Sequence, residues 1–402
     1  MAFRYIPRTI ELLIKRMVRQ FPAVVITGPR QTGKSTLLRY LFPDYRYITF
    51  DDPLILEQAL KDPNLLLKSG SEKVILDEIQ YMPDILPYLK MRIDADRDKN
   101  GRYLLTGSQR FQMIRNLSES LAGRIGIAEL MGFDSNERKM KNQTMSPVSE
   151  FVNVCIRGCF PQLVTNNSLE PELWYSSYIQ TYLQRDISVL YNIGDLRSFQ
   201  MFTRLLATRC STVLNYSGIA NELGVSIPTV SRWVSILESG RLAFLLPPYY
   251  KNLGKRITKS PKIYFTDCGL VSFLTGSLFK DIVLKGPMAG PLFENYVVGE
   301  IVKLFLNKGM EPRMFFMRTN NGLEIDLLVE TKSMSVCLLE IKLNATPRSA
   351  MADSIARFKS LFPTIAVERS FVVCLTERNM VLGRDVDAVS LQSALAYIKD
   401  VI

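Results

Sequence analysis

The stretch AVVITGPRQTGKSTLLR, residues 23–39, decides the fold class. It begins with an apolar run, passes through a glycine-rich turn, and continues with apolar residues at helical spacing. The turn from Gly28 to Ser35 matches the phosphate-loop pattern G-x-x-x-x-G-K-[ST] in full. Because the pattern lies between a predicted strand and a predicted helix, we expect an α/β P-loop NTPase fold with a parallel sheet.

The residue types of this turn suit the binding of nucleotide phosphates. Glycines let backbone N–H groups point at an anion, the Lys34 ammonium suits the β- and γ-phosphates, and the Ser35 hydroxyl suits Mg²⁺. The alternative is a chance glycine-rich turn, which both flanking elements argue against. We expect the nucleotide to be bound by Gly28, Pro29, Arg30, Gln31, Thr32, Gly33, Lys34, Ser35 and Thr36.

Two further strands are predicted to end in polar residues that complete the site. The run VILDE places Asp77 and Glu78 at the end of an apolar strand. We expect Asp77 to hold Mg²⁺ and Glu78 to act as the general base that polarises the attacking water. RYLLTGSQ ends a third apolar strand with Thr106, Ser108 and Gln109, and a polar residue there is predicted either to sense the γ-phosphate or to position water.

Arg124 lies in the short turn of SLAGRIGIAEL, between apolar segments. One interpretation makes it a catalytic arginine that stabilises the charge of the transition state, from the same chain or from a neighbouring subunit. The other makes it a surface salt bridge. The residues alone leave both open.

The composition of the 402-residue chain excludes several function classes. It contains no histidine, which rules out Ser-His-Asp and Cys-His catalysis and every metal site with histidine ligands. The net charge of +11 suits a polyanionic partner. Without an apolar run of the ~18 residues that a membrane span needs, we expect a cytoplasmic protein with no membrane partner. Residues near the N-terminus should form a packed amphipathic helix, with a helix lying on a membrane as the alternative.

The runs VVITGPRQTGKSTLL, VILDEIQ, LLTGS and LAGR together resemble predicted ATPases of the AAA+ superfamily that are common in prokaryotes. The resemblance covers about residues 1–131. It implies that the cofactors are ATP and Mg²⁺ and that Ser108 stands at the first sensor position. It also implies that Arg124 is the arginine finger, the residue that stabilises the charge of the transition state. A complete helical lid does not follow in the sequence, so ring assembly stays open and an oligomer is one possibility.

The middle of the chain carries a pattern typical of DNA-binding proteins. The polar stretch at 132–146 is predicted to be a loop or a domain boundary, followed by helices to residue 210. Residues 215–250 read as a winged helix-turn-helix, with Gly224 at the turn. A basic segment from Arg241 to Lys262 follows. The alternatives are a protein-interaction module and a solvated basic loop. The predicted DNA contacts are Thr229, Ser231, Arg232, Lys255 and Arg256.

The last segment carries a second set of charged residues. Glu294 lies on a predicted helix, Asp326 in an apolar strand, and Glu340 and Lys342 on one face of the next strand. Converging carboxylates suit Mg²⁺ or Mn²⁺. The set resembles the D…(D/E)-x-K core of restriction-endonuclease-like nucleases, over about residues 286–402. An active nuclease and an inactive fold kept for docking are both compatible with it.

Together these patterns predict a P-loop ATPase domain at 1–131, a linker and helical segment at 132–210, a winged helix with a basic segment at 211–285, and a restriction-endonuclease-like α/β domain at 286–402. The expected function is Mg²⁺-dependent ATP hydrolysis coupled to DNA or other nucleic acid. The alternatives are an ATP-gated metal-dependent nuclease and a non-catalytic nucleotide-binding interaction protein.

Overall fold

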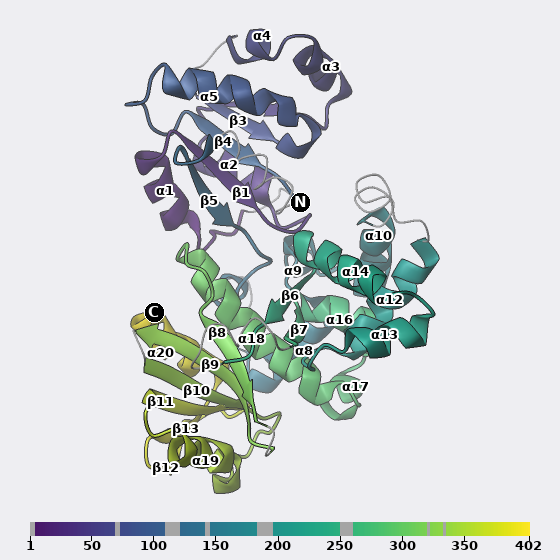
Figure 1. Cartoon of the computed structure of the whole chain (residues 1–402), viewed down its shortest axis with the longest axis vertical. Coiled ribbons are helices and arrows are strands. Elements are labelled where there is room, and N and C mark those ends of the chain that lie inside the picture. The colour runs from purple at the N-terminus through teal and green to yellow at the C-terminus, as the bar shows by residue number, and fades with distance from the viewer. Residues whose placement is uncertain are drawn as a thin grey trace. The chain divides into compact units, whose positions relative to one another are not determined.

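The computed structural model describes residues 5–68, 73–108, 121–140, 145–182, 196–249, 260–319, 322–332 and 335–402. The chain divides into two compact units, coloured by residue number in Figure 1. Unit 1 comprises Met1–Glu137, Ser239–Arg241 and Phe305–Glu311. Unit 2 comprises Arg138–Glu238, Leu242–Leu304 and Pro312–Ile402.

Unit 1 is built on a five-stranded sheet in the order β2-β3-β4-β1-β5, and every strand pair in it is parallel. The parallel sheet confirms the α/β class predicted from the apolar strands. Because the strands run the same way, the residues that follow β1, β3 and β4 meet at one edge. The strands are β1 (Ala23–Thr27), β2 (Arg46–Thr49), β3 (Val74–Asp77), β4 (Tyr103–Thr106) and β5 (Ile125–Glu129). The helices are α1 (Glu11–Gln20), α2 (Lys34–Leu41), α3 (Pro53–Lys61), α4 (Pro63–Lys68), α5 (Leu86–Asp94) and α7 (Ser135–Lys139), the last ending in unit 2, and single 3₁₀ turns span Ile79–Tyr81 and Pro83–Ile85.

Both faces of this sheet are buried by helices. Alternate residues of β1 belong to different apolar cores: Val25 packs with Leu89 of α5, and Val24 packs with Leu13 and Ile14 of α1. The apolar side of α1 is therefore part of the core, as a packed amphipathic helix requires. None of the helices in the described parts of the chain combines the length and the apolar character that crossing a lipid bilayer requires.

The first part of unit 2 is mainly helical. Asn215 caps α13 by accepting a hydrogen bond from the Gly218 N–H at 3.0 Å, and Gly224 ends that helix with a φ of +65°. Trp233 and Leu237 are buried on α14. The helices are α8 (Pro147–Arg157), α9 (Pro161–Thr165), α10 (Pro171–Tyr182), α12 (Leu196–Thr208), α13 (Tyr216–Leu223), α14 (Ile227–Ser239), α16 (Cys268–Thr275), α17 (Lys280–Lys285) and α18 (Ala289–Asn307). The antiparallel strands β6 (Ala243–Leu246) and β7 (Lys262–Phe265) form a two-stranded sheet.

The second part of unit 2 contains a six-stranded mixed sheet in the order β12-β13-β11-β10-β9-β8. Strands β8, β9 and β10 are antiparallel, whereas β10, β11 and β13 are parallel. The strands are β8 (Met314–Arg318), β9 (Glu324–Lys332), β10 (Ser335–Ile341), β11 (Ala366–Val373), β12 (Met380–Gly383) and β13 (Val386–Val389). A 3₁₀ turn (Ser349–Ala352) and the helices α19 (Asp353–Leu361) and α20 (Leu391–Val401) complete it.

The polar stretch predicted as a loop or a domain boundary contains helix α7, in which Glu137 and Arg138 are buried and Lys139 is exposed. The boundary between the two units falls between Glu137 and Arg138. Within unit 1, Glu137 accepts a hydrogen bond from the Thr9 N–H at 2.6 Å and pairs with Arg8 at 3.0 Å. Within unit 2, Arg138 pairs with Glu300 at 2.8 Å. Polar residues that lack apolar periodicity can therefore still form a helix with buried charges, because the partners of these charges come from distant parts of the chain. Residues 141–144 of the stretch lie outside the described residues.

Candidate functional site

The phosphate loop connects β1 to α2 at the edge of the sheet where the parallel strands end. Gly28 has a φ of +137°, and a Cβ there would lie 2.1 Å from the carbonyl oxygen of Leu130, so only glycine fits. Gly33 also has a positive φ and precedes the first residue of α2. The Lys34 ammonium donates to the carbonyl oxygens of Gly28 at 3.0 Å and Pro29 at 2.8 Å. The loop thus surrounds the ammonium predicted to meet the phosphates.

Asp77 accepts hydrogen bonds from four hydroxyl groups, of which the one from Thr49 to Oδ2 is the longest at 3.5 Å. Its Oδ1 accepts hydrogen bonds from Ser35 at 2.6 Å and from Thr106 at 2.5 Å. Its Oδ2 accepts one from Tyr47 at 2.6 Å. Burial raises the pKa of Tyr47, and the Asp77 carboxylate raises it further, so this hydroxyl keeps its proton. The donors compensate the burial of a carboxylate that is only 4% exposed.

The pair Ser35 and Asp77 fits a magnesium ion. The two oxygens already lie 2.6 Å apart, on the loop and on the neighbouring strand end. Mg²⁺ prefers oxygen ligands at about 2.0–2.1 Å and is usually held by one or two carboxylates together with substrate phosphates. These residues supply one hydroxyl and one carboxylate beside the phosphate loop, which is the donor set that such an ion takes.

Glu78 occupies a special backbone conformation next to Asp77. Its φ is +56°, in the left-handed region that glutamate rarely adopts. Its N–H donates to the Thr106 hydroxyl at 3.0 Å, and its carboxylate accepts a hydrogen bond from the Gln80 amide. The same amide donates to the Ser108 hydroxyl at 3.3 Å. Gln80 therefore links Glu78 and Ser108, two predicted site residues that follow different strands.

Arg124 lies at the opposite edge of the sheet from the phosphate loop. It precedes β5, whose first residue Ile125 aligns with Ala23 at the start of β1, whereas the loop follows the end of β1. Four strand residues separate the two edges, a distance of about 13 Å. The guanidinium makes a bidentate ion pair with Asp94, at 2.7 and 3.1 Å. This placement favours the salt-bridge interpretation within one chain; a role toward a neighbouring subunit stays a prediction.

Three residues that support the site were not predicted. Arg8 donates to the carbonyl oxygens of Thr32 at 2.9 Å and Met131 at 2.8 Å, which ties the phosphate loop to the segment after β5. Gln80 and Tyr47 contact the two carboxylates directly. Only Tyr47 had a usable signal, because strand alternation puts it on the same face as Thr49, beside the strand that carries Asp77. Gln31 and Thr36 of the predicted set are exposed.

The four residues of the second predicted set lie near one another, and lysines pair with their carboxylates. The Lys342 ammonium lies 3.1 Å from Asp326 Oδ2 and 2.8 Å from Glu340 Oε2, as the predicted strand pair requires. Burial raises the pKa of Glu340 to about 7, and the nearby Asp326 carboxylate also raises it. Glu294 accepts a hydrogen bond from Tyr264 at 2.6 Å and pairs with Lys262, and burial and the nearby Asp326 carboxylate raise its pKa. Within the described ranges, no group of three or more Cys, Asp or Glu side chains is arranged to hold a metal ion.

The predicted DNA contacts lie in three different environments. Ser231 and Arg232 are exposed on α14, and Thr229 is half-buried in its first turn. Lys255 and Arg256 lie outside the described residues. Lys262, which ends the predicted basic segment, is 3% exposed and is not part of a surface patch. That part of the prediction is wrong, because its charge is paired inside the fold.

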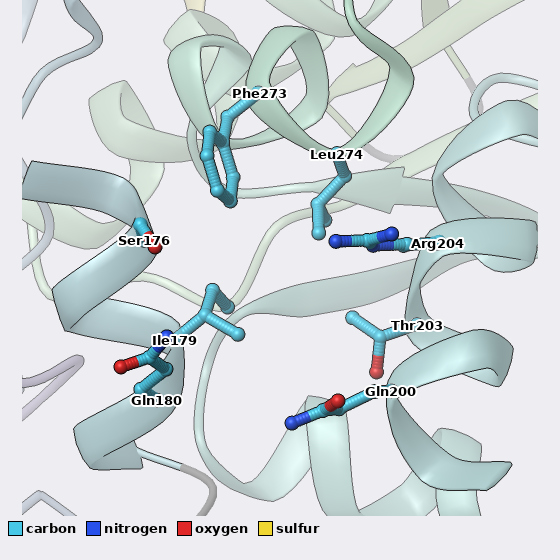
Figure 2. Close-up of a pocket in the computed structure, with 8 residues that line it drawn as sticks. All are labelled: Ser176, Ile179, Gln180, Gln200, Thr203, Arg204, Phe273 and Leu274. Atoms are coloured by element: carbon cyan, nitrogen blue, oxygen red, sulfur yellow. The ribbon is translucent and has the colours of Figure 1, made fainter. Parts of the chain in front are cut away.

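A small cavity lies between α10, α12 and α16 of unit 2 (Figure 2). Its volume is about 100 Å³, well below the roughly 300 Å³ at which ligand pockets begin. It is too small for a nucleotide, and none of the predicted site residues lines it. The lining residues are Ser176, Ile179, Gln180, Gln200, Thr203, Arg204, Phe273 and Leu274.

Sequence comparisons assign the ATPase part of the chain. A family model for an AAA domain matches residues 20–139, and models of two domains of unknown function, DUF8612 and DUF4143, match residues 148–280 and 289–394. The uncharacterized proteins Rv2008c of Mycobacterium tuberculosis and Mb2031c of Mycobacterium bovis are each 30% identical to it over 360 residues. The match covers 87% of this chain and 78% of each relative. The chain therefore belongs to the same family as these two mycobacterial proteins. This family member therefore carries a P-loop ATPase domain of the AAA type, with homology that supports ATP binding and hydrolysis.

Solved structures similar to this family member are distant. A Walker-type ATPase of Pyrococcus abyssi shares 15% identity with a TM-score of 0.43, over 68% of this chain and 99% of that one. The RuvB Holliday junction branch migration motor of Thermotoga maritima shares 17% identity with a TM-score of 0.32, over 59% and 89% of the two chains. DnaA from Aquifex aeolicus shares 14% identity with a TM-score of 0.30, over 57% and 85%.

Proposed function

We propose that the protein is a Mg²⁺-dependent ATPase that converts ATP and water to ADP and phosphate, and that nucleic-acid binding is coupled to this reaction. The observation that carries the proposal is the network around Asp77. It connects the phosphate loop through Ser35 and the neighbouring strand end through Thr106, at 2.6 and 2.5 Å. Such an arrangement supports phosphoryl transfer, in which the protein contributes positioning and charge rather than covalent chemistry.

Each residue of the site has a role that its position supports. The Lys34 ammonium would leave its loop carbonyls for the β- and γ-phosphate oxygens. Ser35 and Asp77 would hold Mg²⁺, which would supply positive charge to the phosphates. Glu78 accepts the proton of the water as the water oxygen bonds to the γ-phosphorus and the bond to the β-phosphate oxygen breaks. Ser108, linked to Glu78 through Gln80, is proposed to orient the γ-phosphate or this water.

The coupling to nucleic acid rests on the middle of unit 2. We infer that residues 211–285 form a winged helix-turn-helix, with α13 and α14 as its helix pair and β6 and β7 as its strands. Ser231 and Arg232 are exposed on α14, where a recognition helix would present them to DNA. For residues 286–402 we infer a restriction-endonuclease-like fold, supported by the position of Asp326, Glu340 and Lys342 on β9, on β10 and just after β10.

An ATPase assay with two variants tests the catalytic part. Lys34→Met removes the phosphate-binding ammonium, so both nucleotide binding and turnover should be lost. Glu78→Gln keeps the shape of the side chain, so nucleotide should still bind while turnover falls by about 10²- to 10⁴-fold. Lys61→Met, on an exposed lysine of α3, is the matched control and should turn over ATP normally. Normal turnover in Glu78→Gln would refute the assignment of the base.

A titration with duplex DNA at several salt concentrations tests the coupling. Arg232→Ala should weaken DNA binding and lower the slope of log affinity against log salt by about one, as the loss of one phosphate contact predicts. Stimulation of ATP turnover by DNA should weaken in parallel. If DNA neither binds nor changes turnover of the wild-type protein, the non-catalytic or protein-interaction alternatives replace the nucleic-acid proposal. Examination of the same DNA for cuts tests the nuclease alternative.

A further inference from the structure

Lys262 is a buried lysine whose ammonium lies between two glutamates of different elements. It begins strand β7, and its side chain is 4% exposed. The ammonium lies 3.1 Å from Glu294 Oε1 on α18 and 2.8 Å from Glu324 Oε1 on β9. It also lies 5.4 Å from the centre of the Phe316 ring. One side chain of the two-stranded sheet therefore joins α18 to the mixed sheet.

The charge of Lys262 is stable in this environment. Burial disfavours the ammonium, but the Glu294 and Glu324 carboxylates outweigh burial and raise the pKa of Lys262. Glu294 receives a second donor from Tyr264, which lies two residues further along the same strand. A buried ammonium is tolerated when it is paired and hydrogen-bonded in this way. Lys262 is thus a fixed positive charge, as a bound metal ion would be.

Backbone pairing on both sides of strand β7 fixes the position of Lys262. Strand β7 pairs with β6 along its length, with Lys262 opposite Leu246. Lys262 also forms a bridge with Val213, and the Leu214 N–H donates to the Pro261 carbonyl oxygen at 2.8 Å. The position of the charge therefore depends on the segment that leads into α13 and on β6, and not on a flexible side chain alone.

Of the two glutamates that pair with Lys262, Glu294 belongs to the second predicted set and Glu324 lies beside a member of that set on β9. Glu324 and Asp326 are two residues apart on β9, so they share one side of the strand. Asp326 in turn pairs with Lys342, beside Glu340. Glu294, Glu324, Asp326 and Glu340 thus form a carboxylate row, and the ammonium groups of Lys262 and Lys342 lie between its members.

We propose that Lys262 is an internal cation that takes the place of a divalent metal ion in this carboxylate row. An ammonium and a dication cannot share the same carboxylates at close range, because both are positive and compete for the same oxygens. The residues that resemble the nuclease core are thus present. While β7 holds Lys262 among them, however, their carboxylates do not fit a metal ion. Displacement of β7 is the change that would open the row to Mg²⁺ or Mn²⁺. This inference concerns unit 2 and does not depend on ATP hydrolysis.

Binding of Mn²⁺ alone to the full chain tests the proposal. Lys262→Met keeps the length of the side chain and removes its charge. We expect this variant to bind one more Mn²⁺ per chain than the wild-type protein, measured by calorimetry and by the loss of the free Mn²⁺ signal in electron paramagnetic resonance. Adding Asp326→Asn should abolish the extra ion. Lys262→Arg, which keeps the charge, and Lys285→Met, which changes an exposed lysine of α17, should both match the wild-type number.

Two outcomes would overturn the proposal. Equal Mn²⁺ numbers for the wild-type protein and Lys262→Met would show that the ammonium does not exclude the metal. An extra ion that persists with Asp326→Asn would show that it binds elsewhere. If Lys262→Met does not fold, the variant Lys262→Met/Glu324→Gln removes one positive and one negative charge together. It should also gain an ion at the remaining carboxylates, and absence of that ion in the folded double variant would equally contradict the proposal.

Discussion

Replacing Glu300 by glutamine should destabilise unit 2 strongly. Glu300 is buried on α18, and its Oε1 lies 2.8 Å from Arg138 and 2.9 Å from Lys303. Burial alone would raise the pKa of Glu300, but Arg138 and Lys303 outweigh it and lower the pKa to about 2. Glutamine keeps the shape of the side chain and leaves two buried cations without their shared anion.

The magnitude follows from the pKa. The shift from 4.5 to about 2 corresponds to roughly 3 kcal/mol, at about 1.36 kcal/mol per pKa unit. Removing one member of a buried ion pair costs a similar amount, about 3–5 kcal/mol. Because the pKa is lowered in the folded state, this contribution is present above pH 4.5 and is lost as the pH falls toward 2. The difference between wild type and variant should therefore shrink by more than half between pH 7 and pH 3.

Urea unfolding followed by tryptophan fluorescence measures this difference. The chain has two tryptophans, Trp174 and Trp233, and both belong to unit 2, so the signal reports that unit. Glu377→Gln, on an exposed glutamate of the same unit, is the control and should change stability by less than about 0.5 kcal/mol. A loss below about 1 kcal/mol at pH 7 for Glu300→Gln, or an equal loss at pH 3, would refute the reasoning.

Two further predictions use other positions. Burial raises the pKa of Glu238 to about 7, so its protonated form stabilises the fold below pH 4.5 and that contribution is lost as the pH rises to 7. Glu238→Gln should therefore be more stable than wild type by up to about 3 kcal/mol at pH 8 and nearly equal to it near pH 4.5, by the same urea assay; a variant that is less stable at pH 8 would contradict this. Gly28→Ala should weaken binding of a fluorescent ATP analogue at least tenfold and lower the thermal midpoint of unit 1 in circular dichroism, because its Cβ would overlap the Leu130 carbonyl oxygen. Gly123→Ala also changes a glycine of positive φ, but its Cβ meets nothing within 4 Å, so it should cost only about 1 kcal/mol and leave affinity unchanged; similar losses in both variants would show that backbone strain, and not the overlap, dominates.

The sequence was sufficient for the features that depend on local order. The phosphate loop, the strand that ends at Asp77 and the strand before Ser108 were predicted from apolar runs and from motifs within a few residues. A parallel sheet then brings the ends of these strands to one edge, so the meeting of Ser35 with Asp77 also followed. Tyr47 shows where this reasoning can be extended, because β2 lies beside β3 in the sheet.

Pairings between distant residues were not accessible from the sequence. The sequence predicts that Lys262 belongs to a basic surface segment, because nothing local indicates that Glu294 and Glu324 lie on either side of it. Arg124 carries a motif-like context, yet its position at the start of β5 and its partner Asp94 depend on the register of the sheet. Apolar periodicity shows which residues are buried, but no such pattern shows which residue a charged side chain will pair with. Buried charged residues are therefore difficult to predict from the sequence.

The left-handed backbone at Glu78 places stability and chemistry in competition at one residue. A φ of +56° suits glycine or asparagine and costs a glutamate about 1–2 kcal/mol. Selection for folding stability alone would therefore tend to replace Glu78, and a stability-guided redesign of unit 1 would choose a residue without the carboxylate. The most stable sequence for this turn and the sequence that supplies the proposed general base are therefore different sequences.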